Sequence, residues 1–176
     1  MKKELSEMTL EALWALFPIA LTAHRAWYED EETRLRAALP GGAVYRLSHI
    51  GSTAVDTIWA KPIVDILLEA AERLQSGGYI RMSAAKARAS FNRGYTPAGF
   101  AERVFHLHLR RRGDNDELYF RDYLLEHPDT ARKYEALKRS LWRRFEHDRD
   151  AYTRGKGDFV AGVTARAKAR YGPRYR

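Results

Sequence analysis

The fold of this chain is decided by the stretch from residue 44 to residue 68, which reads VYRLSHIGSTAVDTIWAKPIVDILL. Its two ends, residues 44–50 and 62–68, have the composition of β-strands and are bounded by Gly, Ser and Pro. The second run is almost entirely apolar, which favours a strand that is covered on both faces. The stretch therefore predicts two strands of one sheet, joined by a short connection.

Segments with helical periodicity lie on either side of this stretch. Near the start of the chain we expect one helix that ends at Pro18 and a second over residues 25–39, with a Pro-Gly-Gly break at 40–42. From Asn115 the pattern is helical to the end, and Pro128 suits the first turn of one of these helices. The sequence therefore predicts helices on both sides of the strands.

The region between the second strand and the C-terminal helices mixes several patterns. We expect a helix over residues 69–76, a short strand over 79–82 and a loop-like flap over 84–101, which is rich in Gly, basic and aromatic residues. Residues 103–110 alternate strictly between apolar residues and Arg or His, which is the clearest strand pattern in the chain. These segments predict a mixed α+β fold in which N-terminal helices and a C-terminal helical segment flank a small mixed β-sheet of roughly three to five strands.

Length and composition indicate one globular domain. With 176 residues, of which 45% are apolar and 31% charged, the chain can form one core and is too short to favour two full-sized domains. We therefore predict a single domain over residues 1–176, with a sheet core over 41–113 and C-terminal helices over 114–176.

Cysteine is absent from the sequence. Its absence excludes disulfides, thiolate catalysis and cysteine-ligated zinc or iron–sulfur sites, and it fits a reducing compartment. The sequence also contains no long apolar run of the kind found in signal peptides and membrane spans. We expect a cytoplasmic protein that has no membrane partner.

The formal net charge of +8 is concentrated towards the C-terminus. Residues 1–40 carry 5 Lys or Arg against 7 Asp or Glu, residues 41–129 carry 12 against 11, and residues 130–176 carry 14 against 5. A basic segment of this kind suits the phosphates of a nucleotide or of a nucleic acid. The alternative is that it forms the solvated face of amphipathic helices.

A Gly-Ser pair, Gly51-Ser52, follows the first predicted strand. Glycine lets the backbone approach a phosphate closely, and serine adds a hydroxyl group. Asp65 lies thirteen positions beyond Ser52 on the second predicted strand, where its carboxylate is suited to a divalent metal ion that bridges the same phosphates. The pair and the acid together indicate a phosphate and metal site, although Gly-Ser alone is common in turns.

Three histidines are candidates for the same site. His106 and His108 alternate along the strand predicted at 103–110, and His49 lies on the first predicted strand. If they converge on Asp65 in one cleft, they form a mixed His/Asp metal site or a proton-transfer group beside a phosphate. The alternative is that these histidines only form hydrogen bonds at the sheet surface.

The charged groups near this motif have two interpretations each. Lys61 and Lys156 can reach phosphate as point charges, whereas an isolated lysine more often faces solvent. Asp65 is either a metal ligand or the acidic member of a structural ion pair with Lys61, Arg46 or Arg103. The contacts of Asp65 therefore decide between a binding site and a structural pair.

Several separate motifs, spread over almost the whole chain, resemble those of the bacterial GrpB family, also known as UPF0157. They are His49 to Val55, Lys61 to Asp65, Phe105 to His108, Phe120 to Leu124 with His127 and Pro128, Tyr134 with Leu137 and Lys138, and Asp148 and Arg149 with Tyr152, Lys156 and Phe159. Their order and spacing carry the resemblance, rather than any single motif.

The resemblance implies a nucleotidyltransferase-like fold, because the nucleotidyltransferase superfamily is similar in placing a Gly-Ser pair after one strand and a metal-binding acid on the next. Taken with the motifs above, it implies a set of residues that bind the nucleotide or its phosphates, namely His49, Gly51, Ser52, Thr53, Lys61 and Lys156. Asp65, His106 and His108 are the candidates for the catalytic and metal-binding residues.

This sequence departs from the superfamily pattern at one important position. A second acid is expected two residues after the first, since carboxylates about 7 Å apart on one strand can hold a pair of Mg²⁺ ions, but Leu67 stands there. A third acid is expected on a later strand, where His106 and His108 are found, and imidazole suits Zn²⁺ or Mn²⁺-like ions better than Mg²⁺. We expect a divalent metal ion, Mg²⁺ or Mn²⁺ with Zn²⁺ as an alternative, and the catalytic activity stays open.

Three functions are consistent with these features. The first is a nucleotidyltransferase-like protein that binds a nucleotide with a divalent metal and transfers a nucleotidyl group by in-line displacement at phosphorus. The second is a non-catalytic accessory module that binds a nucleotide or another phosphate-bearing small molecule; family members fused to dephospho-coenzyme A kinase imply a link to coenzyme A metabolism. The third is nucleic-acid binding through the basic C-terminal helices.

Overall fold

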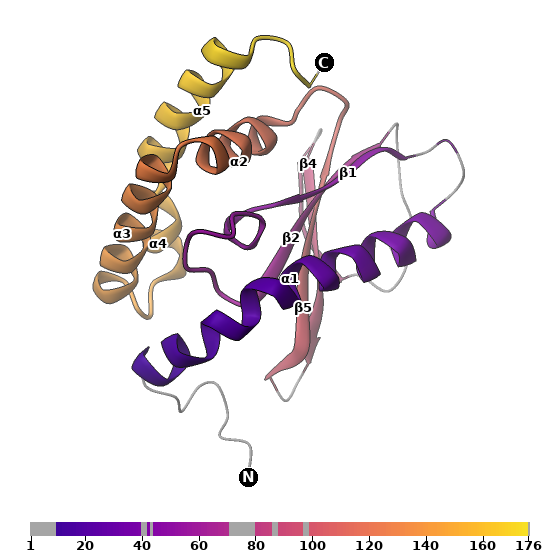
Figure 1. Cartoon of the computed structure of the whole chain (residues 1–176). Coiled ribbons are helices and arrows are strands. Elements are labelled where there is room, and N and C mark those ends of the chain that lie inside the picture. Colours follow the sequence, from indigo (N-terminus) through magenta and orange to yellow (C-terminus); the bar gives the residue numbers. More distant parts are fainter. Residues whose placement is uncertain are drawn as a thin grey trace.

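The structure is a computed structural model that describes residues 10–39, 42, 44–70, 80–85, 88–96 and 99–175. Figure 1 shows its helices and strands along the chain. In order they are α1 (Leu10–Ala38), β1 (Val44–Ile50), the short 3₁₀ helix η2 (Ser52–Ala54), β2 (Ile63–Ala70), β3 (Ile80–Ala85), β4 (Arg88–Thr96), β5 (Gly99–Arg110), α2 (Asp116–Glu126), α3 (Pro128–Arg144), α4 (Arg149–Gly155) and α5 (Gly157–Tyr171). The predicted mixed α+β class is confirmed.

One mixed sheet organises the described residues. It has five strands in the order β1-β2-β5-β4-β3, in which β2 and β5 are parallel and the other neighbours are antiparallel. The parallel register sets Asp65 of β2 beside His106 of β5. Because side chains alternate along a strand, His108 lies on the same face as His106, two residues further along β5.

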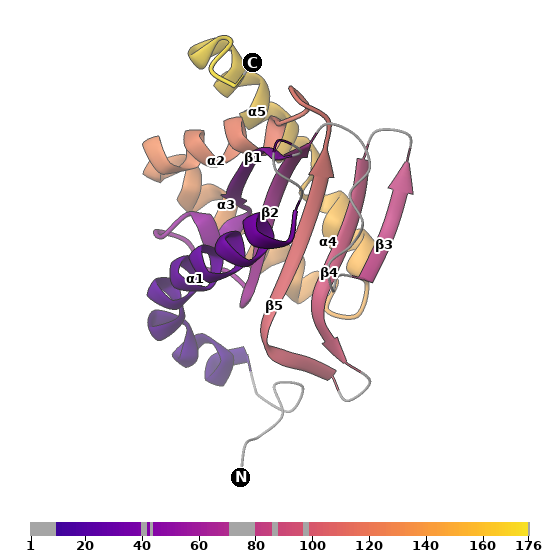
Figure 2. The same cartoon turned by 90° about the vertical axis from the view of Figure 1, so that its right-hand side faces the viewer.

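Both faces of the sheet are covered, as the apolar sequence of β2 predicts. On one face, Leu35 of α1 packs with Ile66 of β2 and Phe105 of β5 in the main core. On the other face, Leu67 packs with Ile50 of β1 and with Leu118 of α2. Figure 2 shows α1 in front of the sheet and the C-terminal helices fainter behind it. Asp65 shares the face of Leu67, so it points towards the C-terminal helices.

The expected end of the first helix at Pro18 is wrong, because α1 is continuous over its 29 residues. A proline inside a helix removes one backbone hydrogen bond and strains one turn, at a cost of about 3 kcal/mol. Burial of the C-terminal half of α1 against the sheet, through residues such as Leu35, stabilises the helix as a whole. A local breaker is therefore tolerated.

The expected helix over residues 69–76 is wrong at its start, where Glu69 and Ala70 belong to β2. Residues 71–79, which hold the rest of that helix, lie outside the described residues. The predicted strand at 79–82 corresponds to β3. Among the described helices, none combines the length and the apolar character that a membrane crossing requires.

The expected flap over residues 84–101 is wrong, because β4 and the start of β5 occupy most of it. Gly94 reads as a loop signal, but it lies at a register shift inside β4. Its φ is +96°, and a Cβ atom there would collide with the backbone carbonyl of Arg103 on β5. Glycine is needed at this position because the strands approach closely, so it marks a bulge rather than a loop.

We predict that Gly94→Ala destabilises the protein more than Gly113→Ala, which serves as its matched control. Both glycines have positive φ, but nothing lies within 4 Å of a Cβ placed on Gly113. Gly113→Ala should lower the free energy of unfolding by about 1 kcal/mol through backbone strain alone. Gly94→Ala should lower it by about 2–4 kcal/mol, since the collision adds to the strain. Urea denaturation followed by circular dichroism measures the difference, and equal losses would contradict the close approach.

Candidate functional site

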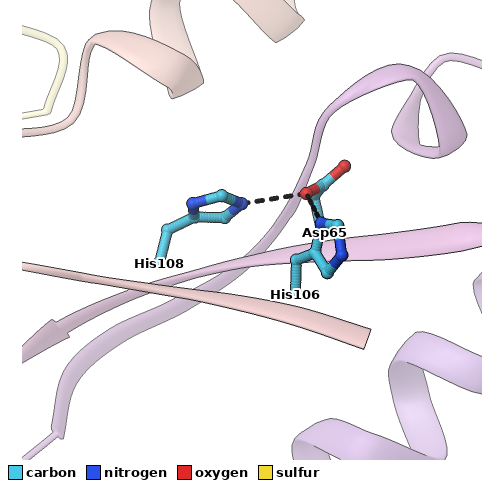
Figure 3. Close-up of side chains that lie close together, drawn as sticks. All are labelled: Asp65, His106 and His108. Carbon is cyan, nitrogen blue, oxygen red and sulfur yellow. Dashed lines mark hydrogen bonds and ion pairs between the residues drawn. The ribbon is translucent and has the colours of Figure 1, made fainter. Parts of the chain in front are cut away.

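The side chains of Asp65, His106 and His108 form a cluster on the sheet face that the C-terminal helices cover. Each offers one potential metal-ligand atom, and these atoms lie within 4.8 Å of one another. His108 Nε2 lies 2.9 Å from Asp65 Oδ1, and His106 Nδ1 lies 3.4 Å from the same oxygen. Figure 3 shows both imidazole rings directed at the one carboxylate. The structure thus brings together three of the four residues that were predicted to converge.

The cluster keeps its carboxylate ionised. Burial by itself would raise the pKa of Asp65, but hydrogen bonds and electrostatic attraction from His106 and His108 outweigh it and hold the pKa below its ordinary value. The side chain of Asp65 is 27% exposed, and those of His106 and His108 are 20% and 24% exposed. The three ligand atoms are therefore charged or polar, close together and only partly shielded from solvent.

Gly51 closes one side of Asp65. It follows β1 with a φ of +73°, and a Cβ atom on it would lie 2.5 Å from Asp65 Oδ2. Only glycine lets the backbone pass this close to the carboxylate in this conformation. The Gly-Ser turn predicted as a phosphate cradle thus lies directly beside the predicted metal ligand.

Tyr95 fixes the orientation of His106, and the sequence analysis missed it because residues 84–101 were expected to form a loop. Its hydroxyl lies 3.0 Å from His106 Nε2, and the two rings stack with centroids 5.9 Å apart. This contact leaves Nδ1 of His106 facing Asp65. In metal sites, a hydrogen bond to the second ring nitrogen commonly sets the tautomer and the ring direction.

Lys138 of α3 connects the Gly-Ser turn to the C-terminal helices. Its Nζ donates to Ser52 Oγ at 2.9 Å and to the backbone carbonyl of Trp59. The side chain is 2% exposed, and burial lowers its pKa to about 7, with a further lowering by the charge of Lys156. Lys138 belongs to one of the family motifs, but a lysine in a helical pattern gives no signal that it reaches a turn far away in the sequence.

Lys61 and Lys156 lie against aromatic rings of the C-terminal helices. Lys61 Nζ is 3.8 Å from the centroid of Trp142 and 5.2 Å from that of Tyr152, and Lys156 Nζ is 4.4 Å from the centroid of Tyr152. Burial and the charges of Lys156 and Arg149 lower the pKa of Lys61 to about 8. Burial also lowers the pKa of Lys156, although the charge of Asp65 opposes this effect. Neither lysine is an ordinary solvated side chain.

The structure does not bring His49 into the cluster. His49 shares the face of Leu47, which packs on α1, and its ring stacks on Tyr28 with centroids 5.0 Å apart. Alternation along β1 therefore points it away from the face of Asp65. Burial lowers its pKa to about 4, so it is a neutral imidazole near pH 7.

Thr53, predicted to bind phosphate, is also used by the fold. Its hydroxyl donates to the carbonyl of Ile63 at 3.1 Å and lies 2.9 Å from His49 Nε2, and its side chain is buried. Because the hydroxyl proton is given to Ile63, His49 Nε2–H donates to Thr53. His49 and Thr53 therefore hold the turn in place.

The alternative of a structural ion pair for Asp65 is not what the structure shows. Arg46 pairs with Glu69 at 2.9 Å, and Arg103 pairs with Asp30 at 2.7 Å. Lys61 lies against aromatic rings instead. Among the described residues, the side chains that hydrogen-bond Asp65 are His106 and His108.

Comparison with known proteins places the chain in a family. A family model described as GrpB protein matches residues 20–166. This chain belongs to the GrpB family. A UPF0157 protein of Pseudomonas aeruginosa is 40% identical to it over 166 residues, which cover 85% of this chain and 67% of the relative. Glutamate-rich protein GrpB of Alkalihalophilus pseudofirmus is 32% identical over 146 residues, which cover 74% of this chain and 83% of the relative.

A solved structure supports the fold of this GrpB-family protein. The crystal structure of conserved protein GrpB from Enterococcus faecalis matches with a TM-score of 0.71 and 27% sequence identity, over 85% of this chain and 94% of that chain. The expectation of GrpB-family membership, made from the separate motifs, is thereby confirmed.

The chemistry open to the Asp65, His106 and His108 cluster follows from its donor set. One carboxylate and two imidazoles are the ligands of many Zn²⁺ and Fe²⁺ sites that keep positions open, whereas Mg²⁺ prefers oxygen ligands. The three lysines at the C-terminal helices (Lys61, Lys138 and Lys156) supply positive charge to the same region. The arrangement is suited to a metal ion and an anion side by side.

We predict that Lys138 makes the stability of the protein depend on pH. The pKa of Lys138 is about 7 in the folded protein and near 10.5 in the unfolded chain. Between pH 7 and pH 10.5 the unfolded chain therefore binds more protons than the folded protein does. The free energy of unfolding, relative to that of Lys138→Met, should rise by a few kcal/mol from pH 7 to pH 10 and stay level below pH 6. Urea denaturation of both proteins across this range measures it. Parallel curves would show that Lys138 stays charged in the fold.

Proposed function

We propose that this GrpB-family protein binds a phosphate-bearing ligand, with a nucleotide as the first candidate, through a divalent metal ion held by Asp65, His106 and His108. The observation that carries the proposal is that three ligand atoms within 4.8 Å of one another share a region with desolvated lysines. Desolvating a lysine costs free energy. A bound phosphate would recover much of that cost, because it places negative charge among the ammonium groups.

The proposed metal ion is of the Zn²⁺ or Mn²⁺ type. Two imidazoles and one carboxylate fit such an ion better than they fit Mg²⁺. His106 would bind through Nδ1, since its Nε2 contacts the Tyr95 hydroxyl, and His108 would bind through Nε2, which faces Asp65. A metal ion in this position would supply Lewis-acid polarisation of a phosphoryl oxygen.

The placement of the chain in the nucleotidyltransferase superfamily is part of this proposal. The Gly-Ser turn beside an acid on the next strand supports it. In this chain the residue two positions after Asp65 is Leu67, which is buried against Ile50 and Leu118. A two-metal site built on two carboxylates is therefore not available here. Any nucleotidyl transfer would use one metal ion and would depend on the lysines to neutralise the leaving phosphates.

Leu67 also favours a second candidate function, binding without turnover. A buried leucine at the position of the second carboxylate is what a module would have if it had kept the ligand site and lost the two-metal chemistry. Such a protein would serve as an accessory to a partner enzyme, for example in coenzyme A metabolism. Transfer of a radiolabelled nucleotidyl group to an acceptor separates the two candidates, because only the first function produces it.

We predict that Zn²⁺ or Mn²⁺ stabilises the protein through the His/Asp cluster. At a metal concentration about 100 times Kd, the free energy of unfolding should rise by about 2.7 kcal/mol. For a chain of this size that corresponds to a rise in Tm of about 5–10 °C. A thermal-shift assay with Zn²⁺, Mn²⁺ and Mg²⁺ measures it, and Mg²⁺ should have the smallest effect.

Variants of the cluster test where the metal binds. Asp65→Ala and His106→Ala should lose the metal-dependent rise in Tm. His147→Ala should keep it, because His147 is exposed in the turn between α3 and α4. Equal stabilisation of all three variants would place the metal elsewhere and overturn this part of the proposal.

We predict that the lysines contribute to nucleotide affinity and not to metal affinity. Lys61→Met and Lys156→Met should each weaken the binding of ATP in the presence of Mn²⁺ by about tenfold, the equivalent of 1.4 kcal/mol. Lys133→Met, on an exposed position of α3, is the matched control and should bind normally. Isothermal titration calorimetry measures the dissociation constants of ATP and of Mn²⁺ for each variant. Unchanged ATP binding in Lys61→Met and Lys156→Met would contradict the proposed role of these lysines in anion binding.

A further inference from the structure

The partly exposed side chain of Ser52 lies beside the buried amine of Lys138. It begins η2 directly after Gly51 and is neither fully buried nor fully exposed. Its Oγ lies 2.9 Å from Lys138 Nζ, and its side chain also shares a hydrogen bond with the hydroxyl of Tyr134. Tyr134 and Lys138 are four residues apart on α3, so one face of the helix presents both groups to the serine.

Lys138 is placed to act as a base. Burial lowers its pKa to about 7, which the negative charge of Glu135 opposes and the positive charge of Lys156 assists. The rings of Tyr134 and Trp59 lie 5.0 Å and 5.6 Å from Nζ. In these surroundings a substantial fraction of the lysine is neutral at physiological pH, and a neutral amine can accept a proton from a serine hydroxyl.

A purely structural role explains only one of the two contacts of Lys138. The hydrogen bond to the carbonyl of Trp59 ties α3 to the connection between β1 and β2. The second contact, to a serine hydroxyl beside the metal ligands, adds little to that tie. A serine hydroxyl and a lysine amine at hydrogen-bond distance are the nucleophile and base of known Ser-Lys sites.

We propose that Ser52 is a nucleophile, that Lys138 is its general base, and that its target is the phosphorus atom of a phosphoanhydride. The choice of substrate rests on the proposed function, because the lysines and the His/Asp cluster indicate a polyphosphate. The reactivity of Ser52 towards phosphorus can be tested independently of the proposed function.

The proposed step balances without any further co-reactant. Ser52 Oγ gives its proton to neutral Lys138 Nζ and forms a bond to phosphorus. The bond from that phosphorus to the bridging oxygen breaks, and the electron pair leaves with the departing phosphate. The positive charge of Lys61 and Lys156, of which Lys156 is near enough to interact with Asp65, would stabilise the departing phosphate. The product is a phosphoester on Ser52. The oxygen of water or of an acceptor hydroxyl then bonds to phosphorus and loses its proton to solvent, while the bond from phosphorus to Ser52 Oγ breaks and the Lys138 ammonium returns its proton to Oγ.

Two probes test this nucleophile on the full chain. The first is a fluorophosphonate, which reacts with activated serines at phosphorus and leaves a stable adduct that peptide mass spectrometry can locate. The second is ATP with Mn²⁺, labelled at the α or at the γ phosphate, with the reaction stopped in acid at short times. We expect both probes to modify Ser52, and the position of the radiolabel shows which phosphorus is attacked.

Variants distinguish a chemical role of Ser52 and Lys138 from a purely structural one. Ser52→Ala should abolish the labelling, and Ser140→Ala, at an exposed serine of α3, should leave it unchanged. Lys138→Arg keeps the positive charge but cannot accept a proton near neutral pH, so it should slow fluorophosphonate labelling at least about 100-fold. Thermal melts of each variant confirm that it is folded, and Lys138→Met serves in place of Lys138→Arg if the larger side chain prevents folding.

The outcomes distinguish this inference from the proposed function. The proposal that Ser52 is a nucleophile activated by Lys138 would be overturned by either of two results. One is the absence of a fluorophosphonate adduct on Ser52 of the folded protein, and the other is unchanged labelling in the folded Lys138 variant. If ATP and Mn²⁺ stabilise the protein but ATP leaves no label, the nucleotide site stands and transfer from ATP to Ser52 is excluded. If ATP does not bind while the fluorophosphonate still labels Ser52 through Lys138, the proposed nucleotide function fails and the nucleophile stands.

Discussion

The hydrogen-bonded pairing of Asp65 with His106 and His108 is the interaction on which the candidate site depends. It exists because β2 and β5 are parallel neighbours, so that residues 65 and 106 are opposite one another and share a face. An isolated carboxylate in a sheet covered on both sides would carry a large desolvation cost. The two imidazoles offset that cost and hold the acid in its ionised form, which is the form that binds a metal ion. The backbone around it is adapted to the same carboxylate, since only glycine fits at position 51.

Much of this site could be predicted from periodicity. The strict alternation of residues 103–110 predicts that His106 and His108 share a face, and the apolar run around Asp65 predicts an interior strand. Alternation also explains why His49 does not join them, but its direction depends on which face of β1 turns to α1. That choice depends on tertiary packing, which no short stretch of sequence contains.

The contributions of Lys138 and Tyr95 could not be predicted in the same way. Lys138 is 86 positions from Ser52 along the chain, and a lysine in an amphipathic helix has the same local pattern whether it faces solvent or a buried turn. Tyr95 follows Gly94, whose loop signal concealed a strand because the need for glycine arises from the carbonyl of Arg103 on the neighbouring strand. Pro18 is a similar case, in which packing of a long helix outweighs a local breaker. In each case the deciding contact is between segments far apart in the sequence.

The balance of charge gives the site its chemical character. The His/Asp cluster has one carboxylate, and Leu67, two residues further along β2, takes part in apolar packing. Burial and neighbouring positive charges lower the pKa of Lys61 and Lys138, whereas the charge of Asp65 acts on Lys156 and opposes the effect of burial there. A divalent cation held by the cluster would add positive charge to that of the lysines, so the region would attract an anion more strongly once the metal ion is bound. The metal and the phosphate should therefore bind cooperatively, each supplying the charge that the other requires.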